Sequence, residues 1–141
     1  MKQEVVQDWM TREVITIAPD PSLKDAHDIM RKKNIRRLPV VTHGKVLGIV
    51  TLGDIRGAEP SQASSLSVWE MNDMLARLKV SEIMSRNPAT IQQTASIGEA
   101  AQTMLDKKFS GLPVVDDANH LVGIITESDI FRLVASEWNK T

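Results

Sequence analysis

The sequence predicts an α+β fold with α/β-like character, built from two βαββα units in a chain of 141 residues. Two observations predict it. One pattern occurs twice, in residues 6–56 and 80–131, and each copy alternates short β-branched runs with helical periodicity. Each copy of about 50 residues would bury too little surface to be stable alone, so we expect one compact unit of two interdependent halves with clefts between them.

The repeat is quantitative. With a shift of 74, thirteen residues of the first copy meet an identical residue in the second, among them Met10 with Met84 and Pro39 with Pro113. One extra residue enters near Ala118, and a shift of 75 then adds five identities. These five are Gly48, Ile49, Thr51, Asp54 and Ile55. The shared spacing of apolar, Pro and Gly positions indicates a duplication.

Each copy opens with a strand and a helix. Residues 14–17 are β-branched and precede Pro19, which predicts a strand. Ser22 with Asp25, and Ser96 with Glu99, have the spacing of capping boxes. The apolar positions that follow predict one buried helix face in each copy: Leu23, Ala26, Ile29 and Met30, then Ile97, Ala100, Met104 and Leu105.

A hairpin and a second helix complete each copy. Residues 38–42 and 46–51 predict two strands joined through His43 and Gly44, and residues 116–120 form the corresponding turn in the second copy. The last helices open near Thr51 and Thr126. Apolar runs such as 38–41 indicate strands covered on both faces.

The chain divides into a first repeat (1–58), a connecting segment (59–79) and a second repeat (80–141). Residues 57–65 are rich in Gly, Pro, Ser and Ala and predict a loop. Ser67 with Glu70 then opens a helix whose apolar stripe is Val68, Met71, Leu75 and Leu78. The stripe either packs on the chain itself or, with Trp69 and Met74, forms a dimer contact.

Composition excludes several classes of function. A net charge of −1 and 4% aromatic residues argue against nucleic acid as a partner. The three histidines lack metal-ligand spacing, and no nucleophile motif, Walker loop or dinucleotide fingerprint occurs, so we expect no metal site, no catalytic residues and no enzyme. The chain has no Cys, no apolar run of membrane-spanning length and no signal-like start, so we expect a cytoplasmic protein without a membrane partner.

The two copies resemble a tandem pair of CBS domains, the arrangement called a Bateman module, as found in compact stand-alone bacterial proteins. Leu-Pro-Val-Val at 38–41, Gly-Ile-Val-Thr at 48–51 and Asp54 carry the resemblance, together with their counterparts at 112–115, 123–126 and Asp129. The resemblance covers nearly the whole chain. It implies two βαββα units related by a pseudo-twofold axis and packed sheet to sheet, often paired into a homodimer.

The resemblance also implies a regulatory function without a cofactor. Its usual ligands are AMP, ADP, ATP or S-adenosylmethionine, bound between the repeats, and the regulated target stays unknown. Asp54 and Asp129 would hold the ribose hydroxyls, because a carboxylate can accept two vicinal hydrogen bonds. The remaining implied contacts are Thr51 and Thr126 at the ribose or phosphate, Thr16 and Thr90 near the phosphates, and Val14 and Ala89 at the adenine.

The copies differ beside this site. Arg36 and Arg37 precede Leu38, whereas Ser110 and Gly111 hold the same places in the second copy. The arginines either face a phosphate, which would make the two clefts unequal, or belong to a solvated helix end. Thr-x-x-Asp likewise either binds ligand or caps a helix, and the two roles are compatible. A ligand-free dimerisation or protein-interaction module is the alternative function.

Overall fold

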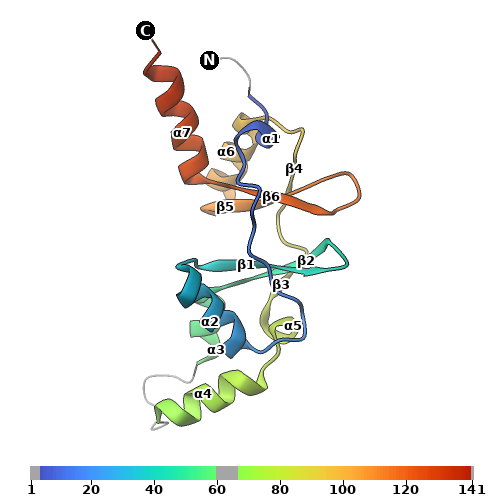
Figure 1. Cartoon of the computed structure of the whole chain (residues 1–141), viewed down its shortest axis with the longest axis vertical. Coiled ribbons are helices and arrows are strands. Elements are labelled where there is room, and N and C mark those ends of the chain that lie inside the picture. Colours follow the sequence, from blue (N-terminus) through green and yellow to red (C-terminus); the bar gives the residue numbers. More distant parts are fainter. Residues whose placement is uncertain (1–3, 60–66, 141) are drawn as a thin grey trace. The chain divides into compact units, whose positions relative to one another are not determined.

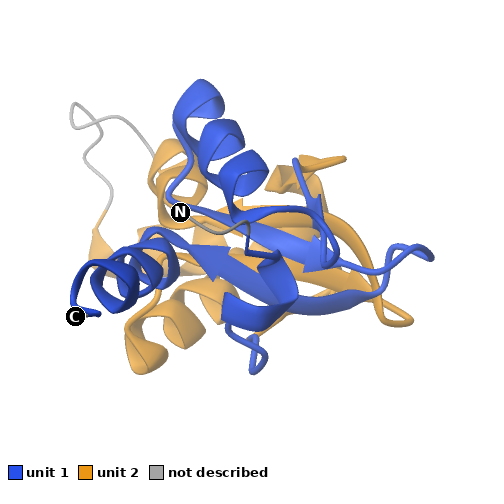
Figure 2. Cartoon of the chain, turned by 90° about the horizontal axis from the view of Figure 1, so that it is seen from above, with its two compact units in different colours: residues 1–14, 89–141 blue, residues 15–88 orange. Residues whose placement is uncertain are grey.

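The computed structural model describes residues 4–59 and 67–140. The chain divides into two compact units. Unit 1 comprises Met1–Val14 with Ala89–Thr141, and unit 2 comprises Ile15–Pro88. Figure 2 colours them separately, and both the N-terminal and the C-terminal parts of the chain belong to unit 1. The first segment of each sequence repeat therefore belongs to the unit that contains the rest of the other repeat.

Unit 2 contains a three-stranded sheet in the order β1-β2-β3, covered by helices. Its elements are α2 (Leu23–Lys33), β1 (Arg37–Thr42), β2 (Lys45–Thr51), α3 (Leu52–Ala58), α4 (Val68–Arg77), α5 (Val80–Ile83) and β3 (Ser85–Arg86). Helices α2 and α3 lie on the same side of the β1–β2 hairpin (Figure 1). His43 and Gly44 both adopt positive φ, 51° and 79°, as a tight two-residue hairpin turn requires.

Unit 1 repeats this plan with a sheet in the order β4-β5-β6. Its elements are α1 (Val6–Trp9), β4 (Ile91–Gln92), α6 (Ile97–Lys107), β5 (Gly111–Val115), β6 (Leu121–Thr126) and α7 (Glu127–Trp138). Strand β4 is parallel to β5, and β5 is antiparallel to β6. Every residue of β5 is buried, which confirms the expectation for its apolar run.

The predicted strand over 14–17 is wrong in extent. Only Ile17 pairs with β1, through a single parallel bridge to Val40. Ile17 N donates to Pro39 O at 3.0 Å, and Val41 N donates to Ile17 O at 2.9 Å. Pro39 has no N–H for the preceding residues, and Pro19 has none for the following ones. In unit 1 the counterpart of Pro19 is Gln93, whose N–H reaches Val115 O at 3.0 Å and continues the pairing.

The helix starts follow the predicted caps. Ser22 and Asp25 form the full capping box that was predicted. Ser96 accepts a hydrogen bond from Glu99 N without the reciprocal bond from the Glu99 side chain, so the second predicted box is incomplete, and Ser67 accepts from Glu70 N. The buried faces of α2 and α6 contain all the expected residues except one. Leu105 is 73% exposed, because it lies one residue beyond the buried Met104, at the position that Arg31 has on α2.

The connecting segment agrees only partly with expectation. Helix α3 continues through Gly57 and Ala58, where the sequence predicts a loop, and residues 60–65 of that loop lie outside the described residues. Helix α4 begins after Ser67 as predicted and packs on α2 with Leu75 buried in the core of unit 2. Val68 and Trp69, at its first turn, are 72% and 84% exposed.

The first segments of the repeats complete the two cores. Val6 and Met10 are buried in unit 1, where Val6 N donates to Ala95 O at 2.8 Å. Val80 and Met84 are the corresponding residues in unit 2. These segments can approach the sheets closely because Gly123 and Gly48 have no side chain. A Cβ on Gly123 would lie 2.8 Å from Thr11 O, and one on Gly48 would lie 2.6 Å from Ser85 O. Each segment thus packs directly against a strand of its sheet.

Candidate functional site

In unit 2, four of the candidate residues meet where β2 passes into α3. Thr51 caps α3: Asp54 N donates to Thr51 Oγ1 at 3.1 Å, and Thr51 N donates to Asp54 Oδ2 at 2.9 Å. Arg37 is the register partner of Thr51 across the hairpin, and Leu52 N donates to Arg36 O at 2.8 Å. The hairpin therefore brings the Arg36–Arg37 backbone next to Thr51 and Asp54. The predicted cap is confirmed.

The carboxylate of Asp54 can accept further hydrogen bonds. It is half-buried, and within the described residues its Oδ1 has no protein hydrogen-bond donor. Arg36 is exposed, so its guanidinium can reach an anion, whereas Arg37 is half-buried and has a protein partner. A carboxylate oxygen without a protein donor, together with an exposed arginine on the adjoining segment, suits a ligand with hydroxyls and a negative charge.

In unit 1 the same geometry occurs at the start of α7. Thr126 N donates to Asp129 Oδ2 at 2.8 Å, and Thr126 Oγ1 accepts from Asp129 N at 3.4 Å. Gly111 is the register partner of Thr126, and Glu127 N donates to Ser110 O at 3.1 Å. Ser110 and Gly111 thus occupy the places that Arg36 and Arg37 have in unit 2.

Asp129 is nevertheless in a different environment, which sequence reasoning missed. It is the buried acidic residue of the described chain, with 1% exposure. Its Oδ1 accepts from Thr11 Oγ1 at 3.2 Å and pairs with the guanidinium of Arg132. Arg132 lies three residues after Asp129 on one helix, a spacing that signals contact. Thr11 is 118 residues away in sequence and carries no such signal.

The other four candidates lie near the first strand position of each unit. Thr16 is exposed and precedes Ile17, the residue that bridges to β1, while Thr90 is half-buried and precedes β4. Val14 is half-buried at the end of the first segment of unit 1, and Ala89 packs against the core of that unit. Neither Thr16 nor Thr90 has a hydrogen bond to a Thr-x-x-Asp residue in the described structure. Their roles therefore stay predictions.

The carboxyl group of Asp116 is perturbed, at the opposite end of the β5–β6 hairpin. Hydrogen bonds from the backbone N–H of His120, and to a lesser degree of Ala118, lower the pKa of Asp116. Both N–H groups lie 2.9 Å from Asp116 Oδ1. Because the folded pKa is depressed, the contribution to stability is present above the ordinary value of 3.8 and is lost as the pH falls through the folded value. This carboxylate stabilises a turn.

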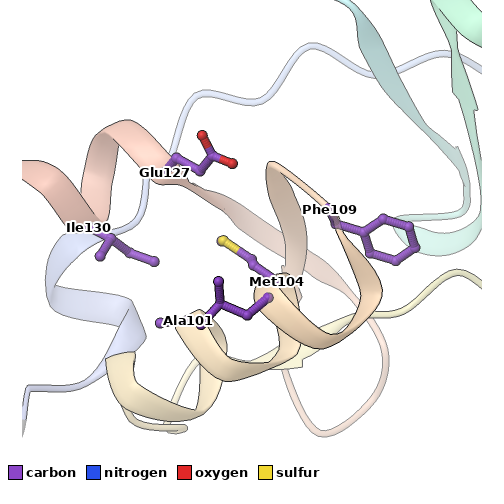
Figure 3. Close-up of a pocket in the computed structure, with 6 residues that line it drawn as sticks. Ala101, Met104, Phe109, Glu127 and Ile130 are labelled. Carbon is purple, nitrogen blue, oxygen red and sulfur yellow. The ribbon is translucent and has the colours of Figure 1, made fainter.

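A hollow of about 240 Å³ lies between α6 and α7 in unit 1. Its lining is apolar except for Glu127, and Figure 3 shows Met104 and Ile130 directed into it with Glu127 at its edge. Leu105 and Phe109, 73% and 45% exposed, complete its rim. Asp129 does not line it, so the hollow and the Thr126–Asp129 carboxylate are separate features.

The comparisons with known proteins place this geometry in a family. The family model described as CBS domain matches residues 6–61 and 80–136, so the chain belongs to the CBS domain family, as a tandem pair. In the residues the structure describes, no helix is long and apolar enough to cross a membrane.

Three similar proteins illustrate the match. Protein MJ1225 of Methanocaldococcus jannaschii is 33% identical over 95% of this chain and 48% of its own length, and its crystal structure matches with a TM-score of 0.80. A CBS domain-containing protein of Dictyostelium discoideum is 35% identical over 92% of this chain and 90% of its own. The CBS domain pair of protein MJ0100, solved with 5'-methylthioadenosine and S-adenosyl-L-methionine, is 33% identical with a TM-score of 0.76, covering 96% of this chain and 99% of that one. The chain spans about half the length of MJ1225.

Proposed function

We propose that the chain is a regulatory module without catalytic activity that senses an adenosine ligand, namely AMP, ADP, ATP or S-adenosylmethionine. The observation that carries the proposal is the pair of Thr-x-x-Asp sites, of which Asp54 keeps a carboxylate oxygen without a protein partner in the described chain. A ribose presents two vicinal hydroxyl donors, which is what such a carboxylate can accept. The ligand's phosphate or carboxylate would then lie toward Arg36.

The relatives support this ligand class. The MJ0100 domain pair was solved with two ligands that both contain an adenosine moiety. The two ligands share the adenine base and the ribose, while of the two only S-adenosyl-L-methionine carries charged groups. A site that selects adenosine compounds would therefore use the ribose for common recognition and would use neighbouring residues to discriminate the remainder. In this chain the backbone of Arg36 lies beside the start of α3, and the exposed side chain of Arg36 supplies positive charge there, which favours an anionic ligand.

The first prediction concerns ligand binding at Asp54. Calorimetric titration of the protein with AMP, ADP, ATP and S-adenosylmethionine should give binding heat with at least one of them. A ligand at 100 times its dissociation constant stabilises the folded state by about 2.7 kcal/mol, which thermal unfolding detects as a raised Tm. Asp54→Asn should remove most of this ligand-induced shift, because the amide is neutral and has an NH2 donor in place of one of the two acceptor oxygens of the carboxylate.

The matched control is Asp73→Asn. Asp73 is an exposed carboxylate of α4 that pairs with Arg77, so its replacement also removes one charge from unit 2. The control should respond to ligand like the wild type. Absence of heat with all four compounds up to millimolar concentration would refute the proposal for this ligand set. Hydrolysis of a nucleotide that Asp54→Asn abolishes would refute the regulatory, non-catalytic part.

Exposed apolar side chains favour a second candidate function, a homodimerisation or protein-interaction module. Two groups of large apolar residues are more than 65% exposed: Val68 and Trp69 on α4, and Leu105, Phe131 and Trp138 on α6 and α7. Clustered exposed apolar surface commonly marks an interface. The two functions are compatible, because a ligand can act through the association of two copies.

A second prediction tests this surface. We expect sedimentation to give the mass of a dimer, twice 15.6 kDa, and we expect Leu105→Glu with Phe131→Glu to shift the population toward monomer. Both side chains are largely exposed, so the double variant should keep the thermal stability of an isolated fold. Lys107→Glu, also exposed and on α6, is the control for added negative charge. A monomeric wild type at tens of micromolar concentration would contradict this candidate.

A further inference from the structure

The two Thr-x-x-Asp carboxylates occupy equivalent positions of the repeat but differ in availability. Both use Oδ2 to accept the N–H of their own capping threonine, at 2.9 Å in Asp54 and 2.8 Å in Asp129. The Oδ1 of Asp129 is occupied by Thr11 and Arg132, and its Oδ2 also accepts Thr126 Oγ1 at 3.1 Å. The carboxylate of Asp129 is thus surrounded by protein donors.

The alignment of the two repeats shows which residues of unit 2 are equivalent to Thr11 and Arg132. The counterpart of Arg132 is Gly57, three residues after Asp54 on α3. The counterpart of Thr11 is Ser85: Thr11 bridges to Ile124, and Ser85 pairs with Ile49 in the same way. Ser85 is exposed and makes no side-chain hydrogen bond to Asp54 within the described residues. Within the described residues, unit 2 therefore lacks both of the side-chain contacts that close the carboxylate of unit 1.

This difference matters for a ligand that donates two hydroxyl hydrogen bonds. At Asp54 such a ligand meets an oxygen that has no protein donor in the described chain. At Asp129 it must displace the guanidinium and the Thr11 hydroxyl from a carboxylate that is 1% exposed. Removing the cationic partner of a buried carboxylate costs free energy, and the displaced groups would then form hydrogen bonds only with water.

We propose that Arg132 and Thr11 close the carboxylate of Asp129 to ribose, so that the chain binds one adenosine ligand, at Asp54. This inference rests on the proposed function and refines it. Arg132 and Thr11 determine which of the two repeated sites binds, although neither would touch the bound ligand. Unit 1 then binds no ligand, and Asp129 has a structural role there: its hydrogen bond with Thr11 connects the first segment of the chain to α7.

The decisive experiment transfers the closing arginine to unit 2. A Cβ on Gly57 has open space around it, since no heavy atom lies within 4 Å, so a long side chain fits there. In Gly57→Arg the guanidinium should pair with Asp54 as Arg132 pairs with Asp129, and calorimetry should show at least a tenfold weaker dissociation constant for AMP. Gly57→Gln controls for side-chain length and should bind as the wild type does. The added cation would by itself attract AMP, so a loss of affinity cannot arise from its charge.

The reciprocal variant opens unit 1. Thr11→Val with Arg132→Met removes both side-chain donors, and titration should raise the stoichiometry from one ligand per chain in the wild type to two. The same titrations are run with S-adenosylmethionine, whose ribose is the same and whose charge differs. If the double variant does not fold, the Gly57 variants test the proposal alone.

The outcomes separate the two proposals. Two ligands per wild-type chain, equal affinity in Gly57→Arg and Gly57→Gln, or a stoichiometry of one in a folded double variant would each overturn the closure of Asp129 while leaving adenosine sensing intact. A wild type that gives no heat with either compound refutes adenosine sensing itself, and the closure with it.

Discussion

Replacement of Gly123 by alanine is expected to lower the free energy of unfolding by about 1–3 kcal/mol, the range found when side chains are forced into packed interiors. A Cβ at this position would lie 2.6 Å from Met10 Sδ and 2.8 Å from Thr11 O. The methionine can move, but the Thr11 carbonyl is fixed by the hydrogen bond from Ile124 N at 2.9 Å. The added methyl group must therefore push the first segment of the chain away from β6. Urea unfolding followed by circular dichroism measures the change.

Two further glycines provide an equivalent position and a control. Gly48 occupies the same place in unit 2, where an added Cβ would lie 2.6 Å from Ser85 O, so Gly48→Ala should be equally damaging. Gly57 lies inside α3 with open space around it, and Gly57→Ala should stabilise by about 0.5–1 kcal/mol, because alanine loses less backbone entropy in a helix. Equal effects of alanine at Gly123 and Gly57 would contradict the close approach of the first segment.

A charge at Val6 should be still more destructive. Val6 is fully buried in the core of unit 1, and Val6→Asp would place a carboxylate there without a partner. We expect a loss of about 3 kcal/mol or more, sufficient to unfold a marginal unit. The damage should appear in β5, β6 and α6, which hydrogen exchange can resolve as lost amide protection. Residues 15–88 should keep theirs to a greater degree.

Val68→Asp is the matched control. The same substitution is made at a valine that is 72% exposed, at the first turn of α4, where an acidic residue complements the helix dipole. Its effect should stay within about 0.5 kcal/mol. If Val6→Asp lost protection mainly within residues 15–58, the assignment of the first segment to unit 1 would be wrong.

Much of the fold was predictable because its signals are local. The β1–β2 hairpin has a two-residue turn with Gly44, and each cap combines a hydroxyl residue with an acidic residue three positions later. The error at residues 14–17 has a physical cause that the sequence contains but local propensity ignores. Pro19 and Pro39 remove N–H donors from two different segments, and their joint effect depends on which residues pair.

The candidate site was predictable only in part. Repetition and resemblance directed attention to Asp54 and Asp129 together, and the hairpin register explains why Arg36 and Arg37 accompany the first of them. The unequal partners of the two carboxylates depend on Thr11, which reaches Asp129 through the tertiary packing of the first segment. Spacing along the chain contains no information on such a contact. The arginines suggested unequal sites for a different reason from the one that the geometry provides.

The exchange of first segments has a consequence for how the protein is made. Unit 2 is one continuous stretch, so all of its residues have been synthesised before most of unit 1 exists. Residues 4–14 cannot pack until β5 and β6 have been synthesised, and until then the side chains of Val6 and Met10 stay exposed to solvent. Unit 1 therefore closes last, around a finished insert, at the entropic cost of joining segments separated by the whole of Ile15–Pro88. During translation the nascent chain should thus acquire its Asp54 site before its Asp129 contacts.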